Sequence, residues 1–279
     1  MKLWLIDYHS KACVKDLTGG FEVESTPIRT PRSLVRLASH TLGSSPAEHT
    51  NIVIASGDVY VGLLGYLIAR RRRARFVFDV YDKYDEFGGY VRPLGFDLFG
   101  FLLRSADLCL FASSGLQAQL ASRCRATALV PNGIDTERFR ARSLELSRQE
   151  LALESDLKYV GYFGSMEPDR GVEDLLEAHQ IVRRDDPRVH LLIAGKRPAT
   201  LDLDRPGVRY MGNLPFDQMP LALASCDVIA IPYRRSPVMD AGASNKIAEA
   251  LCAQRPIATT DTPNFTANFP EQCESLRSI

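Results

Sequence analysis

Short apolar runs alternate with amphipathic segments along most of this chain. Runs typical of buried strands lie at residues 51–55, 75–80, 108–111, 159–163, 189–194 and 228–231. Segments with apolar residues at helical spacing lie between them, at residues 59–69, 94–103, 115–121, 171–182 and 216–224. Shorter strands are predicted at 3–6, 21–24, 128–130, 208–211 and 256–259, and further helices at 31–42 and 148–153. Strands that alternate with helices predict an α/β fold, in which helices cover both faces of parallel sheets.

The alternation pauses once, at residues 136–157, which are rich in charge and lack a strong strand. We therefore predict two Rossmann-like β/α/β domains, at residues 1–135 and 158–279, joined by a linker at 136–157. In such an arrangement the carboxyl ends of the strands point toward a central crevice, where ligands of α/β folds bind.

Composition narrows the class of protein. The 279 residues are 45% hydrophobic and 24% charged, and the formal net charge is +0, so a general nucleic-acid-binding role has no electrostatic support. The six cysteines lack the spacing of zinc or redox motifs, which predicts reduced thiols in a cytoplasmic protein. The apolar run at the N-terminus is too short for a signal peptide, and no apolar stretch is long enough to span a bilayer. The chain also has no nucleophile elbow and no Walker loop.

The most informative local chemistry follows the last long strand. Residues 236–243 are polar and predict an irregular loop, and a helix follows that begins at Ser244 or Asn245. A polar loop that leads into a helix N-terminus favours anions, because free backbone N–H groups and the helix dipole point there. Lys246 and Glu249 share one face of this helix. Together these features predict a phosphorylated ligand that also bears hydroxyl groups.

A second interpretation of the same residues requires no ligand. In that case Asn245 caps the helix, Glu249 favours its first turn, and the Lys246 side chain is solvated. These residues alone leave both interpretations open.

Several longer segments occur in a familiar order. They are DVYDKYDEF (79–87), VPNGIDTERF (130–139), YVGYFGSMEPDRGVEDLLEAH (159–179), LLIAGK (191–196), VRYMGNLPFDQMPLALASCDVIAIPY (208–233) and SNKIAEALCAQRPIATTD (244–261). Over residues 51–261 the chain resembles the family-4 retaining glycosyltransferases of the GT-B fold. Members of that family usually continue well past a strand corresponding to residues 256–259, so the resemblance implies a short or C-terminally abbreviated member.

The resemblance implies an enzyme that moves a sugar from a nucleoside-diphosphate sugar to an acceptor hydroxyl, with retention at the anomeric carbon and without a metal or other cofactor. It places the donor on the C-terminal domain and the acceptor on the N-terminal one. The resemblance does not decide whether the donor nucleotide is UDP, GDP or dTDP.

The resemblance also implies which residues bind the donor. Charge that grows on the leaving diphosphate must be met by cations and backbone N–H groups. Ser165 stands where the family usually has an arginine, so one expected cation is missing. Glu249 matches the glutamate that binds the ribose hydroxyls, and Asp240 lies one residue from the position of a second, sugar-side glutamate, which makes it a catalytic candidate. The predicted donor-binding set is Gly164, Ser165, Arg170, Lys196, Gly212, Asn213, Ser244, Asn245, Lys246 and Glu249.

On the acceptor side, Tyr81 and Asp82 follow the predicted strand 75–80. Asp82 is a second catalytic candidate, because it could orient or deprotonate an acceptor hydroxyl. Asp85 and His9 complete the predicted acceptor side. The alternatives for Asp82 are a cap at the strand end or a structural partner of Lys83, and the donor phosphate could itself serve as the base.

A basic cluster ends one predicted helix, and a strongly apolar helix is predicted at 94–103. These features predict either peripheral contact with an anionic membrane, at about 1 kcal/mol per basic residue, or a solvated arginine run beside an ordinary core helix. The basic cluster consists of Arg70, Arg71, Arg72, Arg73 and Arg75.

Two further functions remain open at this point. Ser165 and the loss of the sugar-side glutamate would fit a catalytically silent nucleotide-binding or scaffold protein that works with a partner. A sugar-nucleotide epimerase on the same fold would need an acid–base pair that the sequence does not identify.

Overall fold

The computed structural model describes residues 2–7, 22–27, 50–86, 92 and 95–270. The chain divides into two compact units, one formed by Met1–Pro131 with Ala241–Ala243 and the other by Asn132–Asp240 with Ser244–Ile279. None of the helices within the described ranges is long and apolar enough to cross a membrane.

The first unit is built on a six-stranded sheet with strand order β2-β1-β3-β4-β5-β6, in which every neighbouring pair is parallel. Its elements are β1 (Lys2–Asp7), β2 (Glu22–Pro27), β3 (Thr50–Ser56), α2 (Val59–Arg72), β4 (Arg75–Val80), the 3-10 turn η2 (Tyr84–Glu86), α3 (Leu98–Ser105), β5 (Leu108–Phe111), α4 (Ser114–Leu120), the 3-10 turn η4 (Ala121–Arg123) and β6 (Thr127–Leu129).

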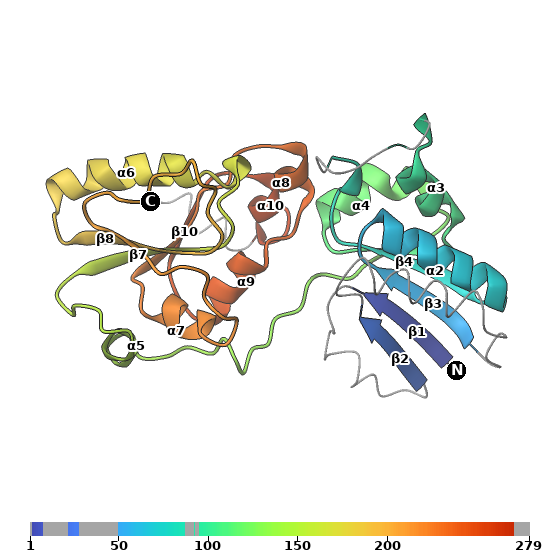
Figure 1. Cartoon of the computed structure of the whole chain (residues 1–279), viewed down its shortest axis with the longest axis horizontal. Helices are drawn as coiled ribbons and strands as arrows, with labels where there is room; N and C mark the ends of the chain where they lie inside the picture. The colour runs from blue at the N-terminus through green and yellow to red at the C-terminus, as the bar shows by residue number, and fades with distance from the viewer. Residues whose placement is uncertain (1, 8–21, 28–49, 87–91, 93–94, 271–279) are drawn as a thin grey trace. The chain divides into compact units, whose positions relative to one another are not determined.

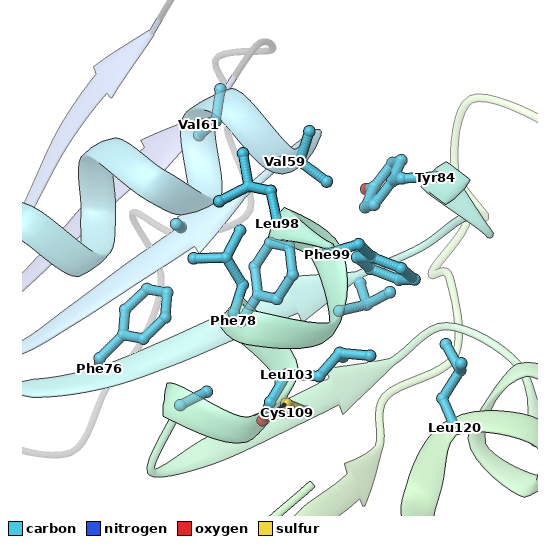
Figure 2. Close-up of a cluster of buried hydrophobic side chains, with 14 of the residues drawn as sticks. Val59, Val61, Phe76, Phe78, Tyr84, Leu98, Phe99, Leu103, Cys109 and Leu120 are labelled. Carbon is cyan, nitrogen blue, oxygen red and sulfur yellow. Dashed lines mark hydrogen bonds between the residues drawn. The ribbon is translucent and has the colours of Figure 1, made fainter. Parts of the chain in front are cut away.

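Aromatic rings fill the core that α2 and α3 form with this sheet (Figure 2). Phe76 and Phe78 are two apart on β4, so both point to the same face of the sheet, and their rings stack at 6.2 Å. Phe78 also meets Phe99 of α3 edge-on at 6.3 Å. On α2, a Cβ atom at Gly62 would lie 2.8 Å from both Phe78 and Leu102, so the helix comes as close to this core as only a glycine permits.

The second unit holds a five-stranded parallel sheet with strand order β11-β10-β7-β8-β9. The order reverses between β7 and β10, and such a switch point opens a ligand-binding crevice at the carboxyl ends of the strands. Its elements are α5 (Leu144–Glu150), β7 (Lys158–Phe163), the 3-10 turn η5 (Pro168–Arg170), α6 (Val172–Asp185), β8 (Val189–Ala194), β9 (Val208–Tyr210), α7 (Met219–Ala224), β10 (Val228–Ile231), α8 (Pro237–Ala241, whose last residue is assigned to the first unit), α9 (Asn245–Cys252), β11 (Ile257–Thr259) and α10 (Pro263–Thr266).

Helices cover both faces of this second sheet, with α6 on one face and α7 and α9 on the other (Figure 1). Side chains alternate along each strand, so neighbouring residues enter different cores. Tyr162 and Leu191 belong to the core under α6, whereas Phe163 and Leu192 belong to the core under α7 and α9. The predicted α/β fold with two Rossmann-like sheets is therefore confirmed. The helix predicted at 31–42 lies outside the described residues.

One local prediction is wrong. Residues 236–243 were expected to form an irregular loop, but α8 occupies part of them. Ser236 begins this short helix, because its Oγ accepts a hydrogen bond from Met239 N at 3.1 Å and its backbone oxygen accepts one from Asp240 N at 2.8 Å. Pro237 suits the first helical position, where no N–H donor is needed. The Ser-Pro pair was therefore a helix start, with too few residues after it to show an apolar period.

Residues 136–157, the predicted linker, lie within the second unit. The helix in this segment begins at Leu144 rather than at 148, because Ser143 Oγ accepts a hydrogen bond from Leu146 N at 3.3 Å and caps it. Phe139 is buried in the core under α7 and α9. The segment is therefore packed against the domain that it precedes.

Arg148 fastens α5 to the rest of the second unit. Its side chain is only 7% exposed, and it donates to Asp227 Oδ2 at 2.6 Å and to the Ser225 backbone oxygen at 3.0 Å. The guanidinium also lies 5.0 Å from the centre of the Tyr159 ring. A buried charge with these partners destabilises the fold when one partner is removed, because the other loses its hydrogen bonds.

We expect Arg148→Ala to lower the free energy of unfolding by about 2–3 kcal/mol, below the full effect of a buried ion pair because Asp227 is partly exposed. The measurement is urea denaturation of the full chain, followed by circular dichroism. The control Arg142→Ala, at an exposed position of the same segment, should change stability by less than about 0.5 kcal/mol. Equal urea midpoints for the two variants would show that the Arg148 contacts do not stabilise the attachment of this segment.

Candidate functional site

The loops that follow β7, β8 and β9 are joined to one another by backbone hydrogen bonds. Gly164 N donates to the Ala194 oxygen at 2.8 Å, and Gly195 N donates to the Gly212 oxygen at 2.8 Å. Gly195 has φ +131°, and a Cβ atom there would collide with the backbone of Gly164. Glycine is thus required where the strand ends converge, and the convergence forms a continuous backbone surface at the carboxyl edge of the sheet.

Lys246 lies directly over this surface. A Cβ atom built on Gly164 would be 2.1 Å from Lys246 Cε and 2.9 Å from its Nζ, so the lysine stem occupies the space that a side chain would take. Lys246 comes from the first turn of α9, whose N-cap is Ser244, as the sequence predicted. The helix therefore places its ammonium group at the end of β7, beside the switch point of the sheet.

Arg170 reaches the same region from the turn between β7 and α6. Gly171 has φ +66°, and a Cβ atom there would lie 1.8 Å from the Pro232 oxygen, so the turn is pressed against the segment after β10. Arg234 holds this contact through two 2.7 Å hydrogen bonds to the Asp174 carboxylate. These contacts hold the turn that carries Arg170 against the segment after β10.

Tyr233 contacts both of these cations. The Arg170 guanidinium carbon lies 5.2 Å from the centre of the Tyr233 ring, and Lys246 Nζ lies 5.9 Å from the same centre. These distances are within the range of cation–π interactions. The ring is 2% exposed, and its hydroxyl lies 3.1 Å from Ser244 Oγ.

The environment of Arg170 is suited to an anion. Its Nε is buried and forms no hydrogen bond within the described residues, while carboxylate oxygens of Glu167 and Asp169 lie 3.9 Å from it. Its Nη1 has the Met239 sulfur as a partner at 3.2 Å, which is a weak acceptor. A buried charged donor without a good partner is costly, so a ligand that accepts this hydrogen bond would bind favourably.

Glu249 lies one helical turn after Lys246 on α9. Burial raises the pKa of its carboxyl above the ordinary glutamate value, and the ammonium of Lys246 opposes that shift. A buried carboxylate that is not fully compensated is a strong acceptor for ligand hydroxyl groups. The structure therefore brings the predicted Lys246 and Glu249 to one face of α9, and Lys246 shares the Tyr233 ring with Arg170.

Three of the other predicted donor residues are exposed to solvent. Lys196 and Asn213 are exposed, at the ends of β8 and β9, and Asn245 is exposed at the start of α9. Although burial acts to raise the pKa of Glu167, a hydrogen bond from Ser165 and the charges of Arg170 and Lys196 lower it.

Asp240, the predicted catalytic carboxylate of this unit, has an arginine partner. Both of its oxygens lie 2.9 Å from Nε of Arg235, in the loop that leads to α8. Its side chain is 23% exposed. This ion pair turns the Asp240 carboxylate toward its own segment.

A pocket of about 530 Å³ opens beside Tyr233, between α6 and the carboxyl ends of β10 and β11. Its floor is apolar, with Ala230 and Pro232 among its residues. The hydroxyl groups of Thr259 and Thr260 in its wall already donate to backbone oxygens. The pocket therefore offers mainly apolar surface.

In the first unit, a hydroxyl and a carboxylate that the sequence did not single out join the predicted acceptor side. Ser56 Oγ, at the end of β3, donates to Asp79 Oδ2 at 2.5 Å and lies 3.1 Å from the Tyr81 hydroxyl. Ser56 is 1% exposed. Their position at the carboxyl ends of adjacent parallel strands was the available signal.

Asp82 and Asp85 lie on the same side of the first unit. Asp82 is one of the charges that raise the pKa of the buried Tyr84, after burial itself and Tyr81. Asp85 Oδ2 lies 3.9 Å from Arg123, and its Oδ1 is buried without a hydrogen bond within the described residues. His9, the remaining predicted acceptor residue, lies outside the described residues. Within them, no three His, Cys, Asp or Glu side chains are grouped as a metal site would require.

Comparison with known proteins assigns the second unit. Residues 157–273 match the model of the family described as group 1 glycosyl transferases. No curated protein matches the sequence. The match shows that the second unit carries a glycosyltransferase domain, so the prediction of a glycosyltransferase enzyme is confirmed at this level.

Solved structures show the same fold. The structure of Anabaena Alr3699/HepE in complex with UDP and glucose is similar at a TM-score of 0.66 and 16% identity, over 100% of this chain and 91% of that one. A glycosyltransferase from Rickettsia africae gives 0.64 and 12%, over 99% and 88%. The catalytic domain of starch synthase IV from Arabidopsis thaliana, bound to ADP and acarbose, gives 0.59 and 13%, over 84% and 61%. At these identities the likeness shows the GT-B fold.

We expect Glu249→Gln to stabilise the protein at neutral and alkaline pH. Because the folded-state pKa of Glu249 is raised, its stabilising effect is present below the unfolded pKa and is lost as pH rises through the folded pKa. An amide avoids that loss, so the variant should melt at a higher temperature than the wild type at pH 8. The gap should close near pH 4.

The control for this comparison is Glu177→Gln, at an exposed position of α6. It should show no such pH-dependent gap in thermal unfolding. A Glu249→Gln variant that melts below the wild type at pH 8 would contradict the assigned burial of this carboxyl.

Proposed function

We propose that the chain, whose second unit carries a group 1 glycosyl transferase domain, moves a sugar from a nucleoside-diphosphate sugar to an acceptor hydroxyl, with retention at the anomeric carbon and without a metal ion. The observation that supports this most directly is the pair of cations, Arg170 and Lys246, at the carboxyl edge of the second sheet. Lys246 lies over Gly164, and Arg170 has a buried donor available for an anion.

The chemistry explains why two protein cations matter. When the bond from the sugar to the diphosphate breaks, negative charge grows on the leaving phosphate oxygen. Groups placed beforehand at that position lower the barrier, because they need not reorganise during the reaction. Arg170 can donate a directed hydrogen bond, and Lys246 contributes a point charge. Together they can supply the positive charge that a metal ion supplies in other transferases.

Glu249 suits the other end of the nucleotide. A carboxylate accepts two hydrogen bonds, which matches the paired 2′ and 3′ hydroxyl groups of a ribose. Its place one turn after Lys246 would bind the ribose beside the diphosphate. Because the Anabaena structures hold UDP and UDP-glucose, UDP-sugars are the first donors to test here.

The acceptor side rests on the first unit. The Tyr81 hydroxyl is held by Ser56, whose other partner is Asp79. Such a chain of hydrogen bonds fixes the direction in which Tyr81 can bind an acceptor hydroxyl. Asp82 follows Tyr81 directly and is the carboxylate that could orient the attacking oxygen.

A second candidate function is nucleotide binding without turnover. The pairing of Asp240 with Arg235 supports it, because this engages the carboxylate that would lie near the donor sugar. Incubation with UDP-sugars and analysis of released UDP separates the two functions. Binding without release or transfer would favour the silent protein, and the anomeric configuration of a product would test retention.

We expect Lys246→Ala to weaken UDP binding by about 10–100-fold, since a charge-assisted hydrogen bond contributes about 1.5–3 kcal/mol. The measurement is calorimetry with the full chain in the presence of EDTA. The control Lys158→Ala removes an exposed lysine from the opposite end of β7 and should leave the affinity unchanged. If UDP, GDP and dTDP all fail to bind the wild type at millimolar concentration, the proposed function is wrong.

Peripheral contact with an anionic membrane is a further part of the proposal. Arg70 and Arg71 are exposed in the last turn of α2, and the apolar side chains of Leu67 and Phe96 are exposed in the same unit. Basic and apolar groups on one unit are the features that hold proteins at charged membrane surfaces.

We expect the double variant Arg70→Ala with Arg71→Ala to lose about tenfold or more in affinity for vesicles of phosphatidylcholine and phosphatidylserine, at ~1 kcal/mol per arginine. Co-sedimentation at low salt measures this. Arg140→Ala with Arg142→Ala removes two exposed arginines from the second unit and serves as the control. Equal sedimentation of the two double variants would show that Arg70 and Arg71 are ordinary solvated arginines without a role in vesicle binding.

A further inference from the structure

We propose that Tyr233 is a positioning residue for the diphosphate of the donor, and that its ring sets the spacing of Arg170 and Lys246. This inference rests on the proposed function. The two cations come from different elements, Arg170 from η5 and Lys246 from α9. The Tyr233 ring is the group that both contact, at 5.2 Å and 5.9 Å from its centre.

Two like charges in one site repel each other, so something must hold them together before the ligand arrives. The face of an aromatic ring carries partial negative charge and attracts cations without neutralising them. A carboxylate in the same place would compete with the phosphate for both cations. The ring therefore attracts both cations without accepting their hydrogen bonds. The Glu167 and Asp169 carboxylates lie 3.9 Å from Arg170 Nε and form no hydrogen bond with it, so that donor stays available to the ligand.

Tyr233 is held both at its hydroxyl group and at its backbone. Its hydroxyl lies 3.1 Å from the hydroxyl of Ser244, the N-cap residue of α9. Its backbone oxygen accepts a 2.5 Å hydrogen bond from Thr260, in the loop after β11. With 2% exposure, Tyr233 has little freedom to turn. One rigid side chain, Tyr233, thus contacts both η5 and the first turn of α9 and can fix the distance between them.

The other contacts of the two cations do not hold them together as the Tyr233 ring can. The Lys246 side chain packs on the backbone of Gly164, which restricts its position from one side but offers no negative charge to attract it. Among the described residues, Arg170 has the Met239 sulfur as its hydrogen-bond partner at Nη1 and carboxylates at 3.9 Å from Nε. Loss of the attraction to the ring should let the two cations separate.

This has a consequence for selectivity among ligands. A diphosphate can engage both cations at once, whereas a monophosphate needs only one of them. Weakening the ring should therefore reduce the affinity for UDP more than the affinity for UMP. A purely structural role for Tyr233 would reduce both equally, through loss of folded protein.

The test varies the electronic character of the ring at constant shape. Residue 233 is replaced by phenylalanine and then by phenylalanines that carry one, two and three ring fluorines, which progressively weaken attraction to cations. Affinities of the full chain for UDP and UMP are measured by calorimetry, and folding is checked by the melting temperature.

We expect Tyr233→Phe to bind UDP within about threefold of the wild type, and the fluorine series to lose about tenfold in UDP affinity, which is 1.4 kcal/mol. UMP affinity should change by less than about threefold across the series. Tyr233→Leu, which removes the ring, should show the same selective loss.

A UDP affinity that is constant along the fluorine series, or equal losses for UDP and UMP, would overturn the role of Tyr233 and leave the proposed function intact. Failure of UDP, GDP and dTDP to bind the wild type would overturn both. A double-mutant cycle gives an independent readout, because the effect of Lys246→Ala on UDP affinity should shrink in the Tyr233→Leu background.

Discussion

The close approach of two backbone segments at Gly171 and Pro232 underlies the arrangement of the second unit. It joins the turn after β7 to the loop after β10, the two strands that flank the switch point of the sheet. A side chain at residue 171 would force these segments apart. Because Arg170 and Tyr233 are immediate neighbours of this contact, their meeting is a direct result of it. The cation site therefore depends on a glycine that has no side chain of its own to offer a ligand.

Much of the fold could be predicted from the sequence, because buried parallel strands and amphipathic helices leave strong local patterns. The strand at 159–163 and the helix at 171–182 are examples whose observed bounds differ by a few residues at most. The exceptions are short elements governed by a cap. α8 depends on Ser236 and Pro237, and α5 depends on Ser143, and in neither case is the apolar period long enough to be visible.

The site was predictable only in part, for a different reason. Lys246 and Glu249 are one turn apart on a helix, so local spacing indicated their common face. The contacts of Lys246 with Gly164, and of Arg170 with Tyr233, join residues from separate elements. No local pattern encodes such contacts. The ordered motifs suggested Arg170 and Lys246 as cations, but they gave no indication that one tyrosine ring contacts both.

The hydrogen bond from Thr260 to the backbone of Tyr233 has a consequence for the stability of the sheet. β11 has three residues and pairs only with β10 among the described strands, so it is an edge strand that can open locally. When this edge frays, the hydrogen bond to Tyr233 is lost with it. Under the proposed role of Tyr233, nucleotide binding and closure of the β11 edge would be thermodynamically linked, each favouring the other. Changes in the sequence around Thr260 would then tune donor affinity by altering how often that edge is open.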